Sequence, residues 1–238
     1  MSIGDKDGQP LMDGVYLSKT ASHVHVHCDA SHRVVSSAVL NGGFTRATDF
    51  LNLKVKRQAE SRLEDPAVTL QAACDKLGCG DVTVGMMTAA SMKSLRLCRE
   101  DIQGRHFAVL VTTGLENARR AGDRAEYRQL QAVPVERGTI NLCVMTNARI
   151  SDHAMIEMIT VATEAKVAIL HELNIVSPVS GGLATGTGTD AVAVFSGNSG
   201  DPVSFAGKHT LLGERLAIMV MQTIRGSLAY GEEAGSCA

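Results

Sequence analysis

The residues best suited to chemistry lie in a stretch rich in glycine and threonine, Gly181–Val194. Its centre reads Thr185-Gly-Thr-Gly-Thr-Asp190 and leads into a short apolar strand. Alternating glycines let the backbone turn sharply and approach a ligand closely, because they carry no Cβ atom. Threonine hydroxyls donate and accept hydrogen bonds, and Asp190 can orient a hydroxyl or hold a cation. The pattern favours a polar ligand, although a capped β-turn would show the same residues.

A lysine, Lys166, lies within a helix predicted over Asp152–Leu173, with Ser151 as its N-cap. This helix is apolar around most of its circumference, so we expect it to be largely buried. A buried ammonium group needs a partner or a chemical role. Alternatively, the side chain reaches water or pairs with Glu164 or Glu214.

Three histidines alternate with valines in the segment His23-Val-His-Val-His27. In a strand, this spacing places the imidazoles on one face and the valines on the other. Imidazole is a ligand for zinc, copper, iron and nickel, so His25 and His27 are candidate ligands of a divalent metal. The alternative is a solvated strand face over a core lined by valine.

Polar residues end one predicted strand after another, as in Thr112-Thr-Gly114 and Thr146-Asn147. If these strand ends converge, they form one pocket of uncharged hydrogen-bonding groups, which suits a ligand rich in amides and hydroxyls. The candidate binding residues are Asn41, Gly42, Gly43, Thr88, Thr113, Gly114, Asn117, Asn141, Thr185, Gly186 and Gly188.

The composition excludes several classes of partner. The 238 residues are 45% hydrophobic and carry a formal net charge of −2, so electrostatics favours neither nucleic acid nor an anionic membrane. Aromatic residues make up only 3%, which leaves few platforms for stacked bases. No apolar run approaches the roughly 20 residues of a membrane span.

The N-terminal sequence lacks the pattern of a signal peptide, and the six cysteines form no CxxC pair. Neither a zinc knuckle nor a disulfide framework is therefore indicated, and we expect mostly buried thiols in a reducing cytoplasm.

Hydrophobic periodicity predicts a loose leader over residues 1–20 with one short strand near Val15–Leu17, a domain over 21–230 and a tail over 231–238. Helices are expected over Pro66–Leu77, Asp152–Leu173 and from about Thr210 to Tyr230, with a short one after Gly114. Turns are expected at Asp29–His32, which makes a hairpin, and over residues 197–202, and residues 123–137 read as an exposed loop. The fold expected is a single α/β (mixed α+β) domain, in which two long helices pack on a mixed sheet of about eight strands.

Seven stretches, taken together and in order, resemble the adenosylcobinamide amidohydrolase family. They are Ser36–Gly43, Val84–Ala89, Val111–Ala118, Gly138–Asn141, Ala162–Lys166, Thr185–Asp190 and Ala206–Gly213. They span roughly residues 33–226, nearly the whole chain. The histidine strand is not a recognised feature of the family, and the 123–137 segment is long and charged for it.

The resemblance implies an enzyme of cobinamide salvage. It would hydrolyse the amide that joins the propionyl side chain of adenosylcobinamide to aminopropanol, giving adenosylcobyric acid. The small-molecule corrinoid, with its cobalt, is then the substrate. No cofactor is assigned, and a requirement for a divalent metal is left open.

Amide hydrolysis needs a nucleophile or an activated water, a proton for the leaving amine and a stabilised oxyanion. The chain has no GxSxG elbow, no HExxH motif and no recognisable cysteine nucleophile. Either a hydroxyl assisted by a lysine or acid attacks, or a carboxylate activates water. The candidates are Asp190 as base or orienter, Lys166 as base or oxyanion stabiliser, Thr187 or Thr189 as nucleophile or positioner, and His209 with Glu214 as a proton relay; Asn41, Asn117 and Asn141 would bind the amide.

Two other functions fit the sequence. The histidine strand favours a corrinoid-, tetrapyrrole- or metal-binding protein on the same scaffold, without turnover. An amidohydrolase for another amide, such as a siderophore, is the second. The apolar C-terminal helix also suggests a homodimer.

Overall fold

The computed structural model describes residues 8–55, 65–80, 82–126, 130 and 138–235. In these residues the chain forms a nine-stranded mixed sheet, a two-stranded sheet and three α-helices, which confirms the predicted fold class. The strands are β1 (Gln9–Met12), β2 (Val15–Lys19), β3 (His23–Ser36), β4 (Gly43–Lys54), β5 (Thr83–Thr88), β6 (Arg96–Ile102), β7 (Arg105–Thr113), β8 (Ala118–Arg119), β9 (Ile140–Ile150), β10 (Gly186–Thr187) and β11 (Ala191–Val203). The helices are α1 (Pro66–Leu77), α2 (Asp152–Glu172) and α3 (Leu211–Gly235), with a 3₁₀ turn, η1, at Met92–Ser94.

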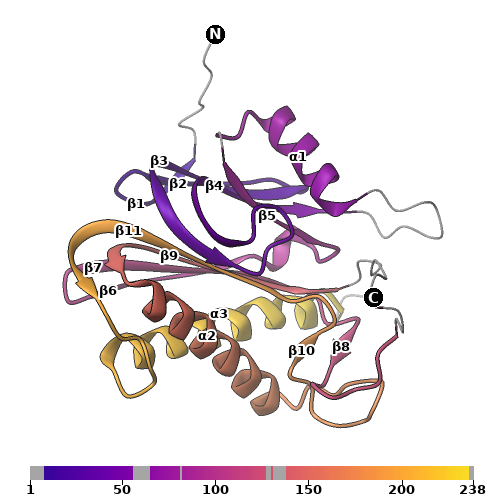
Figure 1. The fold of residues 1–238 in the computed structure, drawn as a ribbon. Coiled ribbons are helices and arrows are strands. Elements are labelled where there is room, and N and C mark those ends of the chain that lie inside the picture. The colour runs from indigo at the N-terminus through magenta and orange to yellow at the C-terminus, as the bar shows by residue number, and fades with distance from the viewer. Residues whose placement is uncertain (1–7, 56–64, 81, 127–129, 131–137, 236–238) are drawn as a thin grey trace.

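Strand β3 belongs to two layers of the molecule. Residues 24–28 pair with β2, residues 33–36 pair with β11, and β4 follows the other edge of β3. The register with β4 shifts between His27 and His32, and a bulge of this kind bends a strand. The sheet therefore folds over itself into an upper layer of β1, β2, β4 and β5 and a lower layer of β11, β9, β7 and β6 (Figure 1).

Helices cover both outer faces, with α1 above the upper layer and α2 and α3 below the lower one (Figure 1). Three hydrophobic cores separate the four layers. One between the sheet layers includes Val26, Phe50, Met145 and Phe195, and one under α1 includes Leu51 and Leu70. The largest joins β7, β9 and β11 to α2 and α3.

The helix boundaries follow from their caps. Asp65 accepts a hydrogen bond from the backbone N–H of Ala67, Pro66 occupies the first turn, and Gly78 adopts the left-handed conformation that ends α1. Ser151 caps α2 through the N–H of Ala154. Both helices begin and end within a residue of the sequence prediction.

Two predicted turns are wrong. The polar residues at Asp29–His32 lie at the bulge of one continuous strand, β3, so the hairpin expected there does not form. Residues 197–202, rich in glycine, belong to β11. In both places, pairing with neighbouring strands outweighs the local preference of these residues for turns.

Other segments also differ from expectation. The short helix expected after Gly114 is replaced by turns and β8. Within the predicted leader, the strand expected near Val15–Leu17 is confirmed as β2, whereas β1 was not expected. Helix α3 continues to Gly235. Residues 1–7, 127–129, 131–137 and 236–238, which include most of the predicted loop over 123–137, lie outside the described residues.

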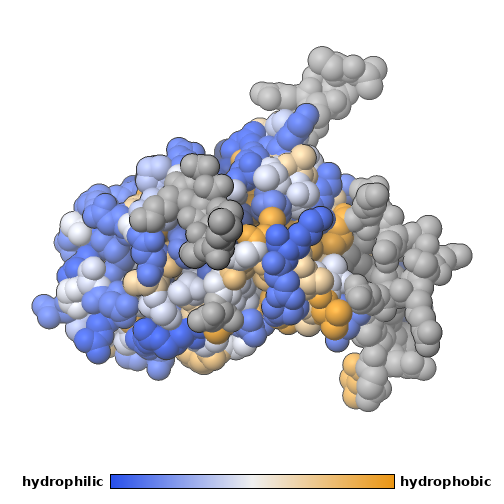
Figure 2. Space-filling view, turned by 90° about the horizontal axis from the view of Figure 1, so that it is seen from above, coloured by the Kyte–Doolittle hydropathy of each residue, from blue (hydrophilic) through white to orange (hydrophobic). Residues whose placement is uncertain are grey.

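Among the described helices, none is long and apolar enough to cross a membrane. Seen from the α1 side, the surface is mainly hydrophilic with small hydrophobic patches (Figure 2). Several apolar residues of α3, such as Leu216 and Ile224, are buried against the sheet and α2, whereas Leu211 at its start is exposed. The homodimer stays a prediction.

Candidate active site

Lys166 and Asp190 form a buried ion pair at one end of the lower layer. The ammonium Nζ of Lys166, on α2, lies 2.5 Å from Oδ2 of Asp190, directly before β11. Their side chains are 9% and 11% exposed. Lys166, which the apolar helix predicted to be buried, therefore pairs with Asp190 and not with Glu164 or Glu214.

Three further donors fix the Asp190 carboxylate. Its Oδ1 accepts the hydroxyl of Thr187 at 2.5 Å and the backbone N–H of Ile140 at 3.0 Å. Its Oδ2 accepts the backbone N–H of Thr187 at 3.0 Å. A carboxylate held between an ammonium group and a hydroxyl can take the hydroxyl's proton when that oxygen attacks a substrate.

Glycine is required next to this carboxylate. A Cβ on Gly186 would lie 2.2 Å from Oδ2 of Asp190 and 2.9 Å from Nζ of Lys166. Strand β10, which holds Gly186 and Thr187, is fixed by antiparallel pairing with β8. The backbone therefore approaches the ion pair more closely than any side chain would permit.

Polar atoms without partners lie beside the pair. Oδ1 of Asn117 and Oγ1 of Thr189 are buried and have no hydrogen bond among the described residues. A Cβ on Gly188 would lie 3.3 Å from Nδ2 of Asn117, so this amide lies against the Gly/Thr turn. Buried polar atoms of a folded protein normally have hydrogen-bond partners, so these two atoms are candidates for contact with a ligand.

The sequence reasoning assigned no site role to Glu116. A Cβ on Gly138 would lie 2.2 Å from its Oε2, and one on Gly114 would lie 3.0 Å away. The exposed Glu116 carboxylate therefore sits against two glycines at the same end of the sheet. The sequence signal for this position was its place in Val111–Ala118, one of the seven stretches that carry the family resemblance.

A second polar network joins the two layers. Asn52 of β4 donates to Oγ1 of Thr112 at 2.8 Å, and Asn141 of β9 donates both to Oδ1 of Asn52 and to the carbonyl of Met87, each at 2.8 Å. Oδ1 of Asn141 has no partner among the described residues. The predicted convergence of polar strand ends is confirmed for Met87-Thr88 of β5 and Thr112-Thr-Gly114 of β7. It is wrong for Thr146-Asn147, because Thr146 pairs with Phe107 at the start of β7, at the opposite end of β9 from Asn141.

Three predicted binding residues near this end have structural partners. Oγ1 of Thr88 accepts the N–H of Ala90, and Thr113 shares its hydroxyl with Ser227. The hydroxyl of Thr185 accepts the N–H of Ala121.

The other predicted residues lie elsewhere. Asn41 donates to the carbonyl of Thr83, at the opposite end of β5 from Thr88. Gly42 packs so tightly on Ala38 that a Cβ would lie 2.2 Å from its carbonyl oxygen, and Gly43 has a φ of 81°. These two glycines build a turn.

His209 and Glu214 lie near the start of α3. The loop before α3 contacts α2 at two places: Glu157 accepts the N–H of Ala206, and Lys208 pairs with Glu164, two residues from Lys166. No hydrogen bond between the described residues joins His209 or Glu214 to Asp190. The sequence predicted where α3 begins, but it could not predict how far that point lies from the Gly/Thr stretch.

His25 and His27 lie on a third surface, the face of β3 opposite Val24 and Val26. Both imidazoles contact Asp49 of β4, at 2.7 and 3.2 Å. The spacing thus predicted that the two imidazoles share one face of the strand, but it did not predict their contact with Asp49.

A cavity of about 420 Å³ lies beyond the end of β5. Three lysines line it, Lys19, Lys54 and Lys93, together with Thr20, Ala21, Ser91 and Met92. Burial, and then the charge of Arg96, lowers the pKa of Lys19. The cavity does not include the Lys166–Asp190 pair.

The chain is similar to a known protein family and to several individual proteins. A family model described as adenosylcobinamide amidohydrolase matches residues 9–235. An adenosylcobinamide amidohydrolase of Methanosarcina mazei is 27% identical, over 81% of this chain and 88% of its own length. An uncharacterized protein of Methanocaldococcus jannaschii is 34% identical, over 63% of this chain and 64% of its own length. Among solved structures, a β-aminopeptidase of a Burkholderia species aligns with a TM-score of 0.44 and 11% identity, over 90% of this chain and 81% of that one.

Proposed function

The chain belongs to the adenosylcobinamide amidohydrolase family, and from that premise we propose that it hydrolyses the aminopropanol amide of adenosylcobinamide to give adenosylcobyric acid. The observation that carries the proposal is the buried constellation of Thr187, Asp190 and Lys166. A role in cobinamide salvage and a cytoplasmic location are parts of the same proposal.

The proposed chemistry begins with Thr187. Its Oγ1 attacks the amide carbonyl carbon while Oδ1 of Asp190, 2.5 Å away, accepts the hydroxyl proton. The C–N bond then breaks, and the proton passes to the leaving amine. Water cleaves the resulting ester, which releases the carboxylic acid and restores the hydroxyl.

Lys166 holds the Asp190 carboxylate in position throughout this sequence. Its positive charge keeps the carboxylate ionised before the reaction, so that Asp190 is ready to accept the hydroxyl proton. A second course, in which Asp190 activates a water directly, uses the same pair and makes Thr187 a positioning residue. The two courses differ in whether an ester to Thr187 forms.

Two unpaired groups suit the substrate amide and its neighbours. Oδ1 of Asn117 accepts hydrogen bonds only, so it would take an amide N–H or the aminopropanol hydroxyl. Oγ1 of Thr189 can donate to a carbonyl oxygen. The corrinoid rim, with its many carboxamides, offers both kinds of group.

The test is to incubate the purified protein with adenosylcobinamide and measure aminopropanol and the corrinoid acid by mass spectrometry. Asp190→Asn and Thr187→Val should each reduce turnover by at least about a hundredfold, because they remove the proton acceptor or the attacking hydroxyl. Thr187→Ser should keep most activity. Thr160→Val, which changes an exposed threonine on α2, is the matched control and should be fully active.

Trapping distinguishes the two courses. A mass increase on the peptide containing Thr187, after rapid acid quenching, supports the ester, and incorporation of labelled water without that adduct supports direct attack. Corrinoid and siderophore amides assayed side by side test the substrate. Absence of turnover on the corrinoid, with and without divalent metal, would contradict the proposal.

A further inference from the structure

A group of potential metal ligands lies far from the ion pair, on the upper face of the upper layer. It consists of His25 on β3, Asp49 on β4 and Cys79 in the turn after α1. One nitrogen of His25, one carboxylate oxygen of Asp49 and the sulfur of Cys79 all lie within 4.8 Å of one another. Such donors can close around a single ion with small side-chain movements.

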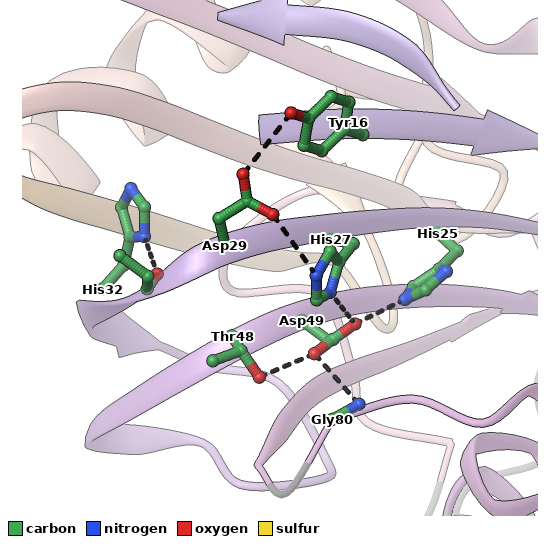
Figure 3. Close-up of polar contacts among 9 residues, drawn as sticks. Tyr16, His25, His27, Asp29, His32, Thr48, Asp49 and Gly80 are labelled. Carbon is green, nitrogen blue, oxygen red and sulfur yellow. Dashed lines mark hydrogen bonds and ion pairs between the residues drawn. The ribbon is translucent and has the colours of Figure 1, made fainter. Parts of the chain in front are cut away.

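The Asp49 carboxylate is held in one orientation. Its side chain is only 1% exposed. Oδ2 accepts the hydroxyl of Thr48 at 2.7 Å and the backbone N–H of Gly80 at 3.0 Å. Oδ1 instead faces the imidazoles of His25 and His27, at 2.7 and 3.2 Å, as Figure 3 shows.

This division of the two oxygens matches a metal-binding carboxylate. Hydrogen bonds to Oδ2 fix the group, and Oδ1 contacts the two imidazoles, which are themselves potential metal ligands. Strand pairing fixes the imidazoles as well, because His27 is directly opposite Asp49 and His25 is opposite Leu51. The first ligand pair therefore lies on rigid strands.

Close packing of the backbone at Cys79 and Gly80 brings the sulfur of Cys79 next to the Asp49 carboxylate. A Cβ on Gly80 would lie 2.4 Å from both Oδ2 of Asp49 and Oγ1 of Thr48, so only glycine lets the chain pass so close to the carboxylate. Cys79 directly precedes it, and its N–H donates to the carbonyl of Cys74 at the end of α1. The thiol is thereby held beside the carboxylate.

We propose that His25, Asp49 and Cys79 bind a zinc-type divalent metal ion. Imidazole nitrogen, carboxylate oxygen and thiolate sulfur are the three ligand types that zinc takes in proteins, whereas calcium and magnesium prefer oxygen alone. Three protein ligands leave a fourth position for water or for His27. The alternative is that the histidines only brace a buried carboxylate, in which case no metal is retained.

The site is independent of the proposed hydrolysis. The side chains of His25 and Asp49 point away from the core between the sheet layers, and the Lys166–Asp190 pair lies at the end of the lower layer beside α2. A catalytically inactive protein would therefore still bind the metal.

The test uses the full-length protein and metal alone. Protein loaded with Zn²⁺ and passed over a desalting column should retain about one equivalent, measured by elemental mass spectrometry. The Co²⁺ form should show a thiolate-to-cobalt charge-transfer band in its absorption spectrum. Cys79→Ser should abolish that band, and His25→Gln should weaken zinc affinity by at least about tenfold.

Two matched variants serve as controls. Cys98→Ser changes another partly buried thiol, on β6, and His106→Gln changes another histidine that contacts an aspartate, Asp101 at 3.4 Å. Both should keep full metal binding. Retention of less than about a tenth of an equivalent, or a cobalt spectrum of wild-type protein without the charge-transfer band, would overturn the proposal even if Cys79→Ser fails to fold.

Discussion

Asp190 accepts hydrogen bonds from Lys166, Thr187 and the backbone of Ile140, which belong to three separate parts of the chain. Removing water from two charges is costly, and their attraction offsets that cost only when the geometry is good and the remaining lone pairs are satisfied. Both conditions are met here. The pair therefore ties α2 to the start of β11 as well as preparing the hydroxyl of Thr187.

Loss of the ammonium group should destabilise the fold. Lys166→Met leaves the Asp190 carboxylate buried without a counter-charge, and we expect the free energy of unfolding to fall by about 3–5 kcal/mol. Urea denaturation measures it. The double variant Lys166→Met/Asp190→Asn should recover part of the loss, because the buried charge is gone.

Another lysine of the same kind is the control. Lys208 pairs with Glu164 of α2, but the two side chains are 66% and 47% exposed. Lys208→Met should change stability by no more than about 1 kcal/mol. Equal losses in Lys166→Met and Lys208→Met would mean that burial of the Lys166 pair has no energetic consequence.

The sequence could identify individual reactive groups but few of their neighbours. Lys166 was recognisable because an apolar helix surrounds it, and Asp190 because it ends a Gly/Thr stretch. Asp49 and Cys79 gave no signal, because their partner His25 is distant in sequence and no fixed spacing connects strands of a sheet. The position of His209 and Glu214 relative to Asp190 could not be read from the sequence for the same reason, and their role as a proton relay stays a prediction.

Strands β4 and β9, from different layers, are joined by the amides of Asn52 and Asn141. These residues are 3% and 2% exposed, so Oδ1 of Asn52 depends on Asn141 for its hydrogen bond rather than on water. Such a contact fixes the position of one sheet layer on the other in a way that interchangeable apolar side chains do not.

Breaking this contact should be costly and non-additive. Asn52→Ala and Asn141→Ala should each lower the free energy of unfolding by about 1–3 kcal/mol, because each leaves polar groups buried without partners. The double variant should lose less than the sum of the two. Urea denaturation of all three proteins, with the exposed Asn198→Ala as a control that changes little, measures the coupling, and strict additivity would contradict it.

Helices were more predictable than strands. The caps at Asp65, Gly78 and Ser151 are local signals, so α1 and α2 could be located from the sequence alone. The continuation of β3 through Asp29–His32 depends on β4 beside it, and that of β11 on β9. Polar and glycine-rich residues favour turns in isolation, and only the distant partner strand decides otherwise.

The four-layer arrangement buries a titratable group at the bend of β3. His32 is 7% exposed, and its ring lies 6.4 Å from that of Phe195. Burial lowers the pKa of His32; the hydrogen bond with the Ala30 carbonyl opposes this, and the charge of Arg46 adds to it. At a pH between the two pKa values, His32 is therefore protonated in the unfolded chain and neutral in the folded protein.

This difference predicts a pH dependence of stability. Above the unfolded pKa of about 6.5, His32 is neutral in both states and the protein keeps its full stability. As the pH falls below that value toward the folded pKa, only the unfolded chain takes up the proton, so the free energy of unfolding decreases. Thermal unfolding between pH 7.5 and pH 5 should show the wild-type melting temperature falling more steeply than that of His32→Gln. Parallel curves for the two proteins would rule out His32 as the source.

The bend of β3 also affects how the protein is made. The upper layer and α1 are complete once the ribosome has released residue 88, yet residues 33–36 of β3 pair with residues 193–196, which are synthesised much later. Until then the second half of β3 has an open edge, available to neighbouring nascent chains. During the same interval Val26 and Phe50 of the upper layer lack Met145 and Phe195, against which they pack in the finished protein. The nascent chain therefore exposes both an open strand edge and an apolar sheet face, and it is then that chaperones would be needed.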